Sequence, residues 1–111
     1  MGDDEAMTRY ETILPGLRVW FRENADSLSN RGVSVFLNET RADWDDASMW
    51  LDFDVPDFAG RITVWDTGAA ELECAAIATE YVRHEHRELR SVEDLYSALN
   101  VLLEWLHINE R

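Results

Sequence analysis

The chain has 111 residues and a mass of 12.9 kDa, so we expect residues 1–111 to fold as a single domain. Hydrophobic residues make up 46% of the sequence and charged residues 30%, which is typical of a globular domain and not of a disordered chain. The 23 Asp and Glu residues outnumber the 10 Lys and Arg residues and give a formal charge of −13. Because this charge would repel nucleic-acid phosphates, DNA and RNA are excluded as expected partners.

Cysteine content and hydropathy indicate where the chain resides. Cys74 is the only cysteine, so no internal disulfide is expected. No apolar run approaches the roughly 18 to 20 residues that a membrane-spanning helix requires, and no membrane association is expected. The first residues include Asp3, Asp4 and Glu5, where a secretory signal would carry positive charge and then an apolar stretch. We therefore expect a cytoplasmic protein.

The N-terminal third of the chain predicts an amphipathic helix from Tyr10 onward. Pro15 disfavours helical geometry at the residue before it, but the apolar stripe keeps its phase across it, so a kink is favoured over a break. Either Asn30 or Gly32 can take the left-handed conformation that ends the helix. The residues of the stripe are Leu14, Leu17, Phe21, Ala25 and Leu28.

Alternating apolar and polar residues then predict two strands. Val33, Val35 and Leu37 form the apolar side of the first. The second follows the acidic loop 41–47 and has two chemically distinct faces. Its predicted core face contains Met49, Leu51, Phe53 and Val55, and its opposite face contains Ser48, Trp50, Asp52 and Asp54.

Residues 56–60 are predicted to turn the chain into a third strand, in which Ile62 and Val64 point inward. Residues 66–68 read Asp-Thr-Gly, a favourable turn sequence for a hairpin to a fourth strand with Leu72, Cys74 and Ala76 inward. A mostly polar fifth strand is expected over residues 81–89.

A second helix is predicted to begin after Ser91, whose side chain is a good N-cap, with Glu93 and Asp94 in the first turn. Short connections between strands favour an antiparallel meander. The expected fold class is therefore α+β, with five strands flanked in sequence by two helices that pack on one sheet face and leave the other exposed. The second helix's apolar stripe consists of Leu95, Leu99, Leu102, Leu103 and Leu106, flanked by Ala98 and Trp105.

No residue pattern predicts a catalytic or metal site. His84 and His86 are two residues apart, so their rings would leave a strand on the same face, but a catalytic zinc site needs a third protein ligand. The remaining histidine, His107, lies at the far end of the second predicted helix. Cys74 occupies an apolar strand position without a nucleophile motif around it. We expect no enzyme activity, no cofactor and no metal, and ordinary edge-strand histidines.

The most informative stretch is residues 39–57, where seven carboxylates face one arginine and tryptophans are interleaved with them. Aromatic anchors within an acidic field suit a basic protein partner, because desolvated rings hold an interface and charge accelerates encounter. The alternative is that the acids only solvate the sheet and each tryptophan packs structurally. The predicted partner-binding residues are Asp43, Trp44, Asp45, Asp46, Trp50, Asp52, Asp54, Trp65, Glu71 and Glu73.

Residues 60–68, with the sequence GRITVWDTG, are followed by Glu71-Leu72-Glu73 and later by SVEDL at residues 91–95. This pattern resembles bacterial immunity proteins of polymorphic toxin systems, in particular the TriTu family, over most of residues 17–106. The resemblance implies a small cytoplasmic non-enzyme that blocks a cognate toxin, the family being linked to toxins that ADP-ribosylate a translation factor. It assigns no contact residues, so the surface predicted above comes from the residues alone.

The leading hypothesis is therefore an immunity protein, monomeric when free, that binds and occludes a cognate toxin domain through its acidic tryptophan-bearing surface. The alternative is a secretion chaperone or adaptor for an effector protein, since small acidic α+β proteins also bind extended segments along a sheet edge or groove. Oligomeric state separates the two, because such chaperones are commonly dimers.

Overall fold

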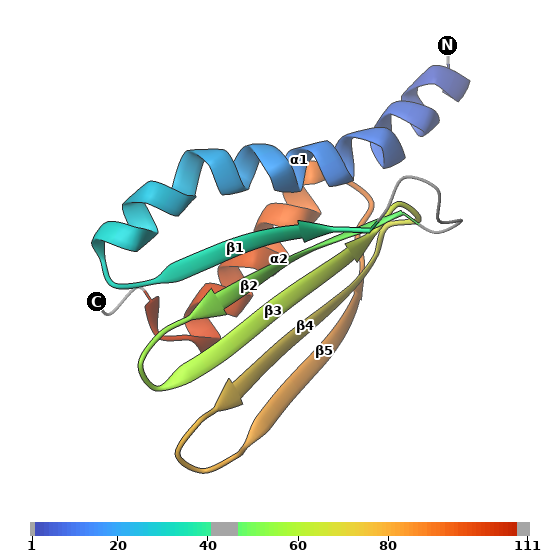
Figure 1. The fold of residues 1–111 in the computed structure, drawn as a ribbon. Coiled ribbons are helices and arrows are strands. Elements are labelled where there is room, and N and C mark those ends of the chain that lie inside the picture. The colour runs from blue at the N-terminus through green and yellow to red at the C-terminus, as the bar shows by residue number, and fades with distance from the viewer. Residues whose placement is uncertain (1, 41–46, 109–111) are drawn as a thin grey trace.

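The computed structural model describes residues 2–40 and 47–108 and confirms the α+β fold (Figure 1). A long first helix precedes five consecutive strands, and a shorter second helix follows them. None of the helices in these residues is both long and apolar enough to cross a membrane. The elements are α1 (Gly2–Asn30), β1 (Ser34–Glu39), β2 (Ser48–Asp54), β3 (Phe58–Trp65), β4 (Ala69–Ala76), β5 (Val82–Glu88) and α2 (Val92–Trp105).

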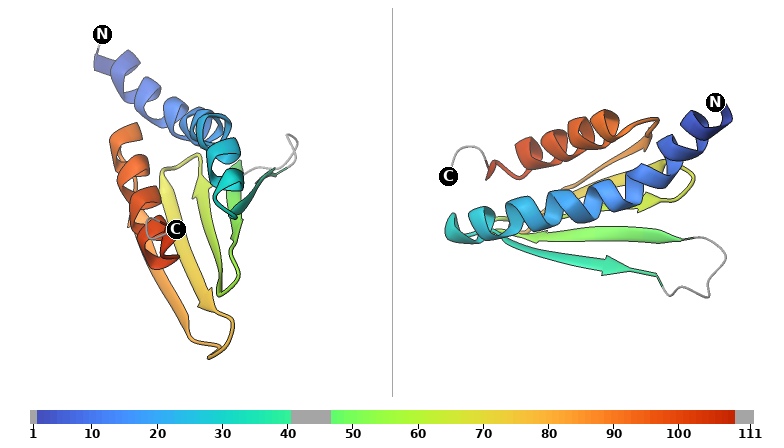
Figure 2. Two further views of the ribbon diagram at one scale, coloured as in Figure 1. Left: turned by 90° about the vertical axis from the view of Figure 1, so that its left-hand side faces the viewer. Right: turned by 90° about the horizontal axis from the view of Figure 1, so that it is seen from above.

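The strands form one antiparallel sheet in the order β1-β2-β3-β4-β5, which is the predicted meander. Both helices lie on the same side of the sheet (Figure 2). Helix α1 packs along β1 and β2, whereas α2 packs on β3 and β4. The core fills the space between the helices and this sheet face, and Leu51, Ile62 and Leu72 at its centre are fully buried. Residues at alternate positions of the same strands point to the opposite side of the sheet.

The buried face of α1 is rotated relative to the predicted stripe. Ile13 and Trp20 are buried, whereas Leu14 and Phe21 are only partly buried against the core. The difference arises because α1 contacts both the sheet and α2. Helix α1 also continues through Pro15, and Figure 1 shows a bent axis, the form that a proline inside a helix favours.

The turns follow the predicted chemistry at both ends of the sheet. Gly32 has a φ of 84°, and the N–H of Val33 donates to the carbonyl of Leu28 while that of Gly32 donates to Ser29, which ends α1 in a Schellman motif. Gly68 has a φ of 93° in the β3–β4 turn. The cap of α2 is also as predicted, because the Ser91 side chain accepts a hydrogen bond from the Asp94 N–H.

The predicted turn over residues 56–60 is too long, because β3 already begins at Phe58. Phe58 pairs with Ala76, and Gly60 faces the helices. A Cβ at Gly60 would lie 3.0 Å from both δ carbons of Leu106. The glycine that reads as a turn residue in sequence therefore gives α2 room to approach the sheet.

Alanine at Gly68 is expected to destabilise the fold more than alanine at Gly32. Both positions have positive φ, where a Cβ costs about 1–2 kcal/mol. A Cβ at Gly68 would in addition lie 2.5 Å from the Leu89 carbonyl oxygen, whereas at Gly32 nothing lies within 4 Å. Urea unfolding should show a free-energy loss of about 1–2 kcal/mol for Gly32→Ala and a larger loss for Gly68→Ala. Equal losses would contradict this account.

Candidate functional site

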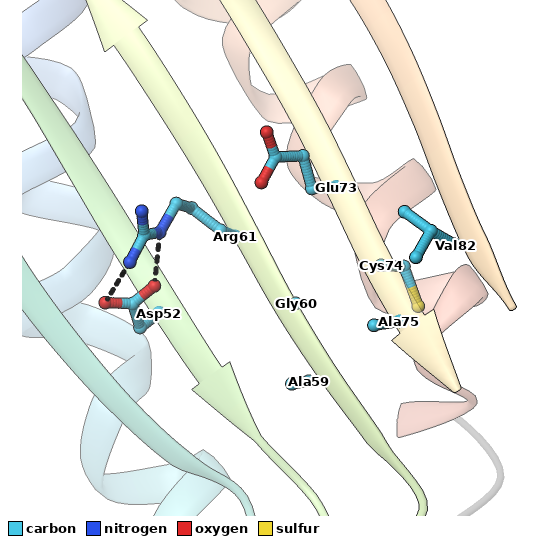
Figure 3. A pocket seen from close by; sticks show the side chains of 8 residues that line it. All are labelled: Asp52, Ala59, Gly60, Arg61, Glu73, Cys74, Ala75 and Val82. Atoms are coloured by element: carbon cyan, nitrogen blue, oxygen red, sulfur yellow. Dashed lines mark hydrogen bonds and ion pairs between the residues drawn. The ribbon is translucent and has the colours of Figure 1, made fainter. Parts of the chain in front are cut away.

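The sheet face turned away from the helices is the candidate site, and we call it the open face. In Figure 3 the helices lie behind the strands as this face is viewed. Phe36 and Val82, which belong to the two edge strands, are 55% and 62% exposed. By register the open face comprises Ser34, Phe36, Asn38, Ser48, Trp50, Asp52, Asp54, Ala59, Arg61, Thr63, Trp65, Ala69, Glu71, Glu73, Ala75, Val82, His84, His86 and Glu88, of which Ser48 is buried.

Cross-strand pairing arranges the polar residues of this face in two neighbouring rows. Each row crosses all five strands, so groups far apart in sequence become direct neighbours. One row runs Phe36, Asp52, Arg61, Glu73, His84, and the next runs Asn38, Trp50, Thr63, Glu71, His86.

Asp52 and Arg61 form the ion pair at the centre of the open face. Arg61 Nε donates to Asp52 Oδ1 at 2.6 Å and Nη2 donates to Oδ2 at 3.3 Å. Asn38 Nδ2 also donates to Asp52 Oδ2, and the Arg61 guanidinium carbon lies 5.9 Å from the centre of the Trp50 ring. The hydrogen bond that Arg61 donates to Asp52 raises the pKa of Arg61. This exposed pair adds little stability but holds the carboxylate, the guanidinium and the indole in one arrangement.

Glu71 is held between two histidines of the edge strand β5. Its Oε2 lies 2.5 Å from His84 Nε2 and its Oε1 lies 2.7 Å from His86 Nδ1. The other ring nitrogen of His86 lies 2.7 Å from Glu88 Oε1. Only an imidazolium donates from both nitrogens, so this geometry favours protonated His86.

The same contacts shift two pKa values on the open face. The hydrogen bond from His86 lowers the pKa of Glu71, and the charge of His84 acts in the same direction. The hydrogen bonds to Glu88 and then to Glu71 raise the pKa of His86. Both histidine rings thus lie on one face, as predicted, and engage carboxylates. In residues 2–40 and 47–108, no group of three or more His, Cys, Asp or Glu side chains is arranged to hold a metal ion.

The structure places on one surface all the predicted partner-binding residues that it describes. Neither Trp50 nor Trp65 is sealed in the core, and each is half-buried. Two of these carboxylates already have partners within the chain, because Asp52 pairs with Arg61 and Glu71 contacts the histidines. The predicted residues on the open face are Trp50, Asp52, Asp54, Trp65, Glu71 and Glu73, whereas Asp43, Trp44, Asp45 and Asp46 lie outside the described residues.

Sequence reasoning missed two contributors to this surface. Phe36 is an exposed aromatic ring in register with Asp52, and its signal was its place among the polar positions of the first strand. Alternation along the third strand places Arg61 on its outer side and predicts no partner for it. Its importance depends on the pairing of β2 with β3, which single-strand alternation does not reveal.

A cation–aromatic contact also occurs between β5 and α2, where Arg83 is exposed and Trp105 is half-buried. Arg83 lies with its guanidinium carbon 5.0 Å from the centre of the Trp105 ring, at the edge of α2. Cys74 is buried beneath that end of the helix, and burial raises the pKa of its thiol. A raised pKa disfavours the reactive thiolate, which agrees with a packing role.

Comparison with known proteins assigns a family to this fold. The family model described as Immunity protein TriTu matches residues 16–105, which include all five strands and α2. No curated protein matches the chain.

His86 is expected to keep its proton at pH values where an ordinary histidine, with a pKa of about 6.5, has lost it. Because its folded-state pKa is raised, its stabilising contribution is complete at low pH and is lost as pH rises through that pKa. NMR titration of the ring protons measures this pKa directly.

Glu88→Gln should lower the pKa of His86, because the bond to Glu88 is the largest cause of the shift. Glu104→Gln, on the exposed side of α2, removes the same charge without touching the ring and serves as the control. An unshifted pKa of His86 in the wild type, or equal effects of the two variants, would contradict the assignment.

Proposed function

We propose that this protein, which belongs to the TriTu family of immunity proteins, is a non-catalytic inhibitor that occludes a cognate bacterial toxin domain with its open face. The observation that carries the proposal is that, in residues 2–40 and 47–108, both helices lie on one sheet face while the opposite face bears tryptophans among carboxylates. Immunity function in general follows from the family, and the surface and mechanism are our inference.

The aromatic side chains of the open face are suited to anchor a partner. Trp50 and Trp65 project from the central strands β2 and β3, whose backbones are paired on both sides. Rings held on a rigid sheet lose little conformational freedom on binding, and tryptophan is enriched among residues that dominate binding energy. Phe36 extends the aromatic surface toward the β1 edge.

The negative charge of the chain favours a partner with a basic surface. A formal charge of −13 speeds association with a basic surface and opposes binding to an acidic one. An active-site mouth that holds an anionic cofactor or substrate is such a basic surface. A toxin that transfers ADP-ribose fits, because it must bind the negatively charged pyrophosphate of NAD. Occupying that mouth excludes the ligand.

The partner is the toxic domain of a polymorphic toxin system, and the inhibitor acts as a monomer in the bacterial cytoplasm. The predicted partner-binding residues Asp43, Trp44, Asp45 and Asp46 are proposed to contact the same toxin domain.

A secretion chaperone is the second candidate, because β1 and β5 are edge strands of the sheet, and an extended peptide can pair with such an edge. Small-angle scattering of the free protein separates the two functions. A monomer supports the inhibitor, and a stable dimer supports the chaperone.

Trp50→Ala is expected to accelerate dissociation from the toxin domain encoded by the neighbouring gene by about tenfold or more, because a central anchor is lost. Tyr96→Ala, an exposed aromatic on α2, is the control and should leave the rate unchanged. Surface plasmon resonance with a catalytically inactive toxin domain measures both. Growth of bacteria that co-express active toxin gives the functional readout. Equal behaviour of the two variants would reject the open face as the binding surface.

Removing acidic charge from the predicted partner-binding residues should mainly slow association and flatten its dependence on salt, because steering is a long-range effect. The same number of charges removed from the helices and the β4–β5 turn should have a smaller effect. The first variant carries Asn at Asp43, Asp45, Asp46 and Asp54, and its control carries Gln at Glu23, Glu80 and Glu104 and Asn at Asp26. Stopped-flow association rates over a salt series decide this, and identical salt slopes would contradict it.

A further inference from the structure

A shallow hollow in the open face lies beside the Asp52–Arg61 pair (Figure 3). Its floor is low because Ala59 and Ala75 face each other across β3 and β4 and rise no higher than a methyl group. Gly60 follows Ala59 on β3, and a Cβ at this position would point toward Leu106 on the helix side. The wall toward β5 is the exposed side chain of Val82. The lining residues are Asp52, Ala59, Gly60, Arg61, Glu73, Cys74, Ala75 and Val82.

The rim of the hollow carries Glu73, a carboxylate whose charge helps to raise the pKa of Arg61 but which makes no direct contact with it. Figure 3 shows the Arg61 side chain reaching across β2 toward Asp52 and away from Glu73 on β4. Glu73 is exposed, and within the described parts of the chain no hydrogen bond or ion pair engages its side chain. His84, its neighbour on β5, bonds Glu71 instead. The two carboxylates and one guanidinium of the lining leave a net negative charge.

We propose that this hollow receives an arginine side chain of the toxin, with its guanidinium on the Glu73 carboxylate. The proposal rests on the proposed function and names one contact within it. The three methylenes of an arginine match the apolar floor formed by Ala59 and Ala75 beside Val82. The planar guanidinium pairs with a carboxylate through two parallel hydrogen bonds.

Two features of the site favour arginine over other side chains. The net charge of the lining attracts a cation, and the Asp52 carboxylate already binds Arg61, which reduces the repulsion between Arg61 and an incoming guanidinium. Lysine offers a point charge without the planar fork and is expected to bind less tightly. An acidic side chain would meet Glu73 directly and is excluded.

The first experiment removes the charge and the space separately. Glu73→Gln keeps the shape of the side chain, and Ala75→Leu fills the hollow without changing any charge. Each should weaken binding of the inactive toxin domain about tenfold or more, whereas Glu104→Gln, an exposed carboxylate on α2, should change it less than about threefold. Thermal unfolding of each variant identifies any loss of binding that comes from misfolding.

A double-mutant cycle then identifies the toxin residue. Each basic residue of the toxin domain is replaced by alanine and measured against wild type and Glu73→Gln. One arginine whose loss has little further effect in Glu73→Gln supports the proposal. Additive effects for every basic residue, or coupling only to a lysine, overturn it.

A second experiment tests the hollow without the toxin. N-acetyl-arginine amide is titrated into the isotopically labelled protein, and the uncharged N-acetyl-citrulline amide is the control. The proposed arginine site is supported if the arginine probe alone causes saturable NMR shifts of the Gly60 and Ala75 amides. These shifts should be lost in Glu73→Gln. No shift, or equal shifts with both probes, overturns the guanidinium site. If the toxin itself does not bind the wild-type protein, the proposed function fails, whereas the probe titration still decides whether the hollow recognises arginine.

Discussion

The structure depends on one constraint, which is that each helix has a single apolar stripe and both stripes must be buried on the same sheet face. Leu51, Ile62 and Leu72 are fully buried on that face, and each buried side chain of this kind contributes about 1.5–3 kcal/mol. The two helices cover neighbouring pairs of strands and together shield this face of the central sheet. No apolar stripe remains to cover the second face. That face therefore stays in contact with solvent, where charged and aromatic side chains can be chosen for binding with little effect on the core.

The charges of the open face are organised in pairs before any partner arrives. Asp52 binds Arg61, and Glu71 binds the two histidines of β5. Such pairs contribute little stability at an exposed site, but they fix side chains that would otherwise move. A partner therefore meets a surface with a defined pattern. In our proposal, the total charge governs how fast the partner associates, and Glu73 selects a basic side chain of the partner.

The family assignment and the description of the open face rest on independent observations. The match over residues 16–105 depends on the pattern of residues along the chain. The open face depends on the way in which the helices pack. An inhibitor needs no reacting groups of its own, and it needs a rigid surface that its target can recognise. A five-stranded sheet with one face exposed offers that surface, because hydrogen bonds between strands fix the positions of its side chains.

Residue patterning along the chain was enough to predict the two helices, the five strands, the meander and the buried side of β1 to β4, because these depend on local periodicity and short connections. The alternation from Met49 to Val55 alone placed Trp50 and Asp52 on the outer side, and Ser91 alone marked the start of α2. What joins Arg61 to Asp52 and Glu71 to His86 is strand register, which no single strand reveals. The rotation of α1 toward Ile13 and Trp20 likewise required its contact with α2. Tertiary structure decided these features because each depends on two segments meeting, and the free energy of that contact is absent from either segment alone.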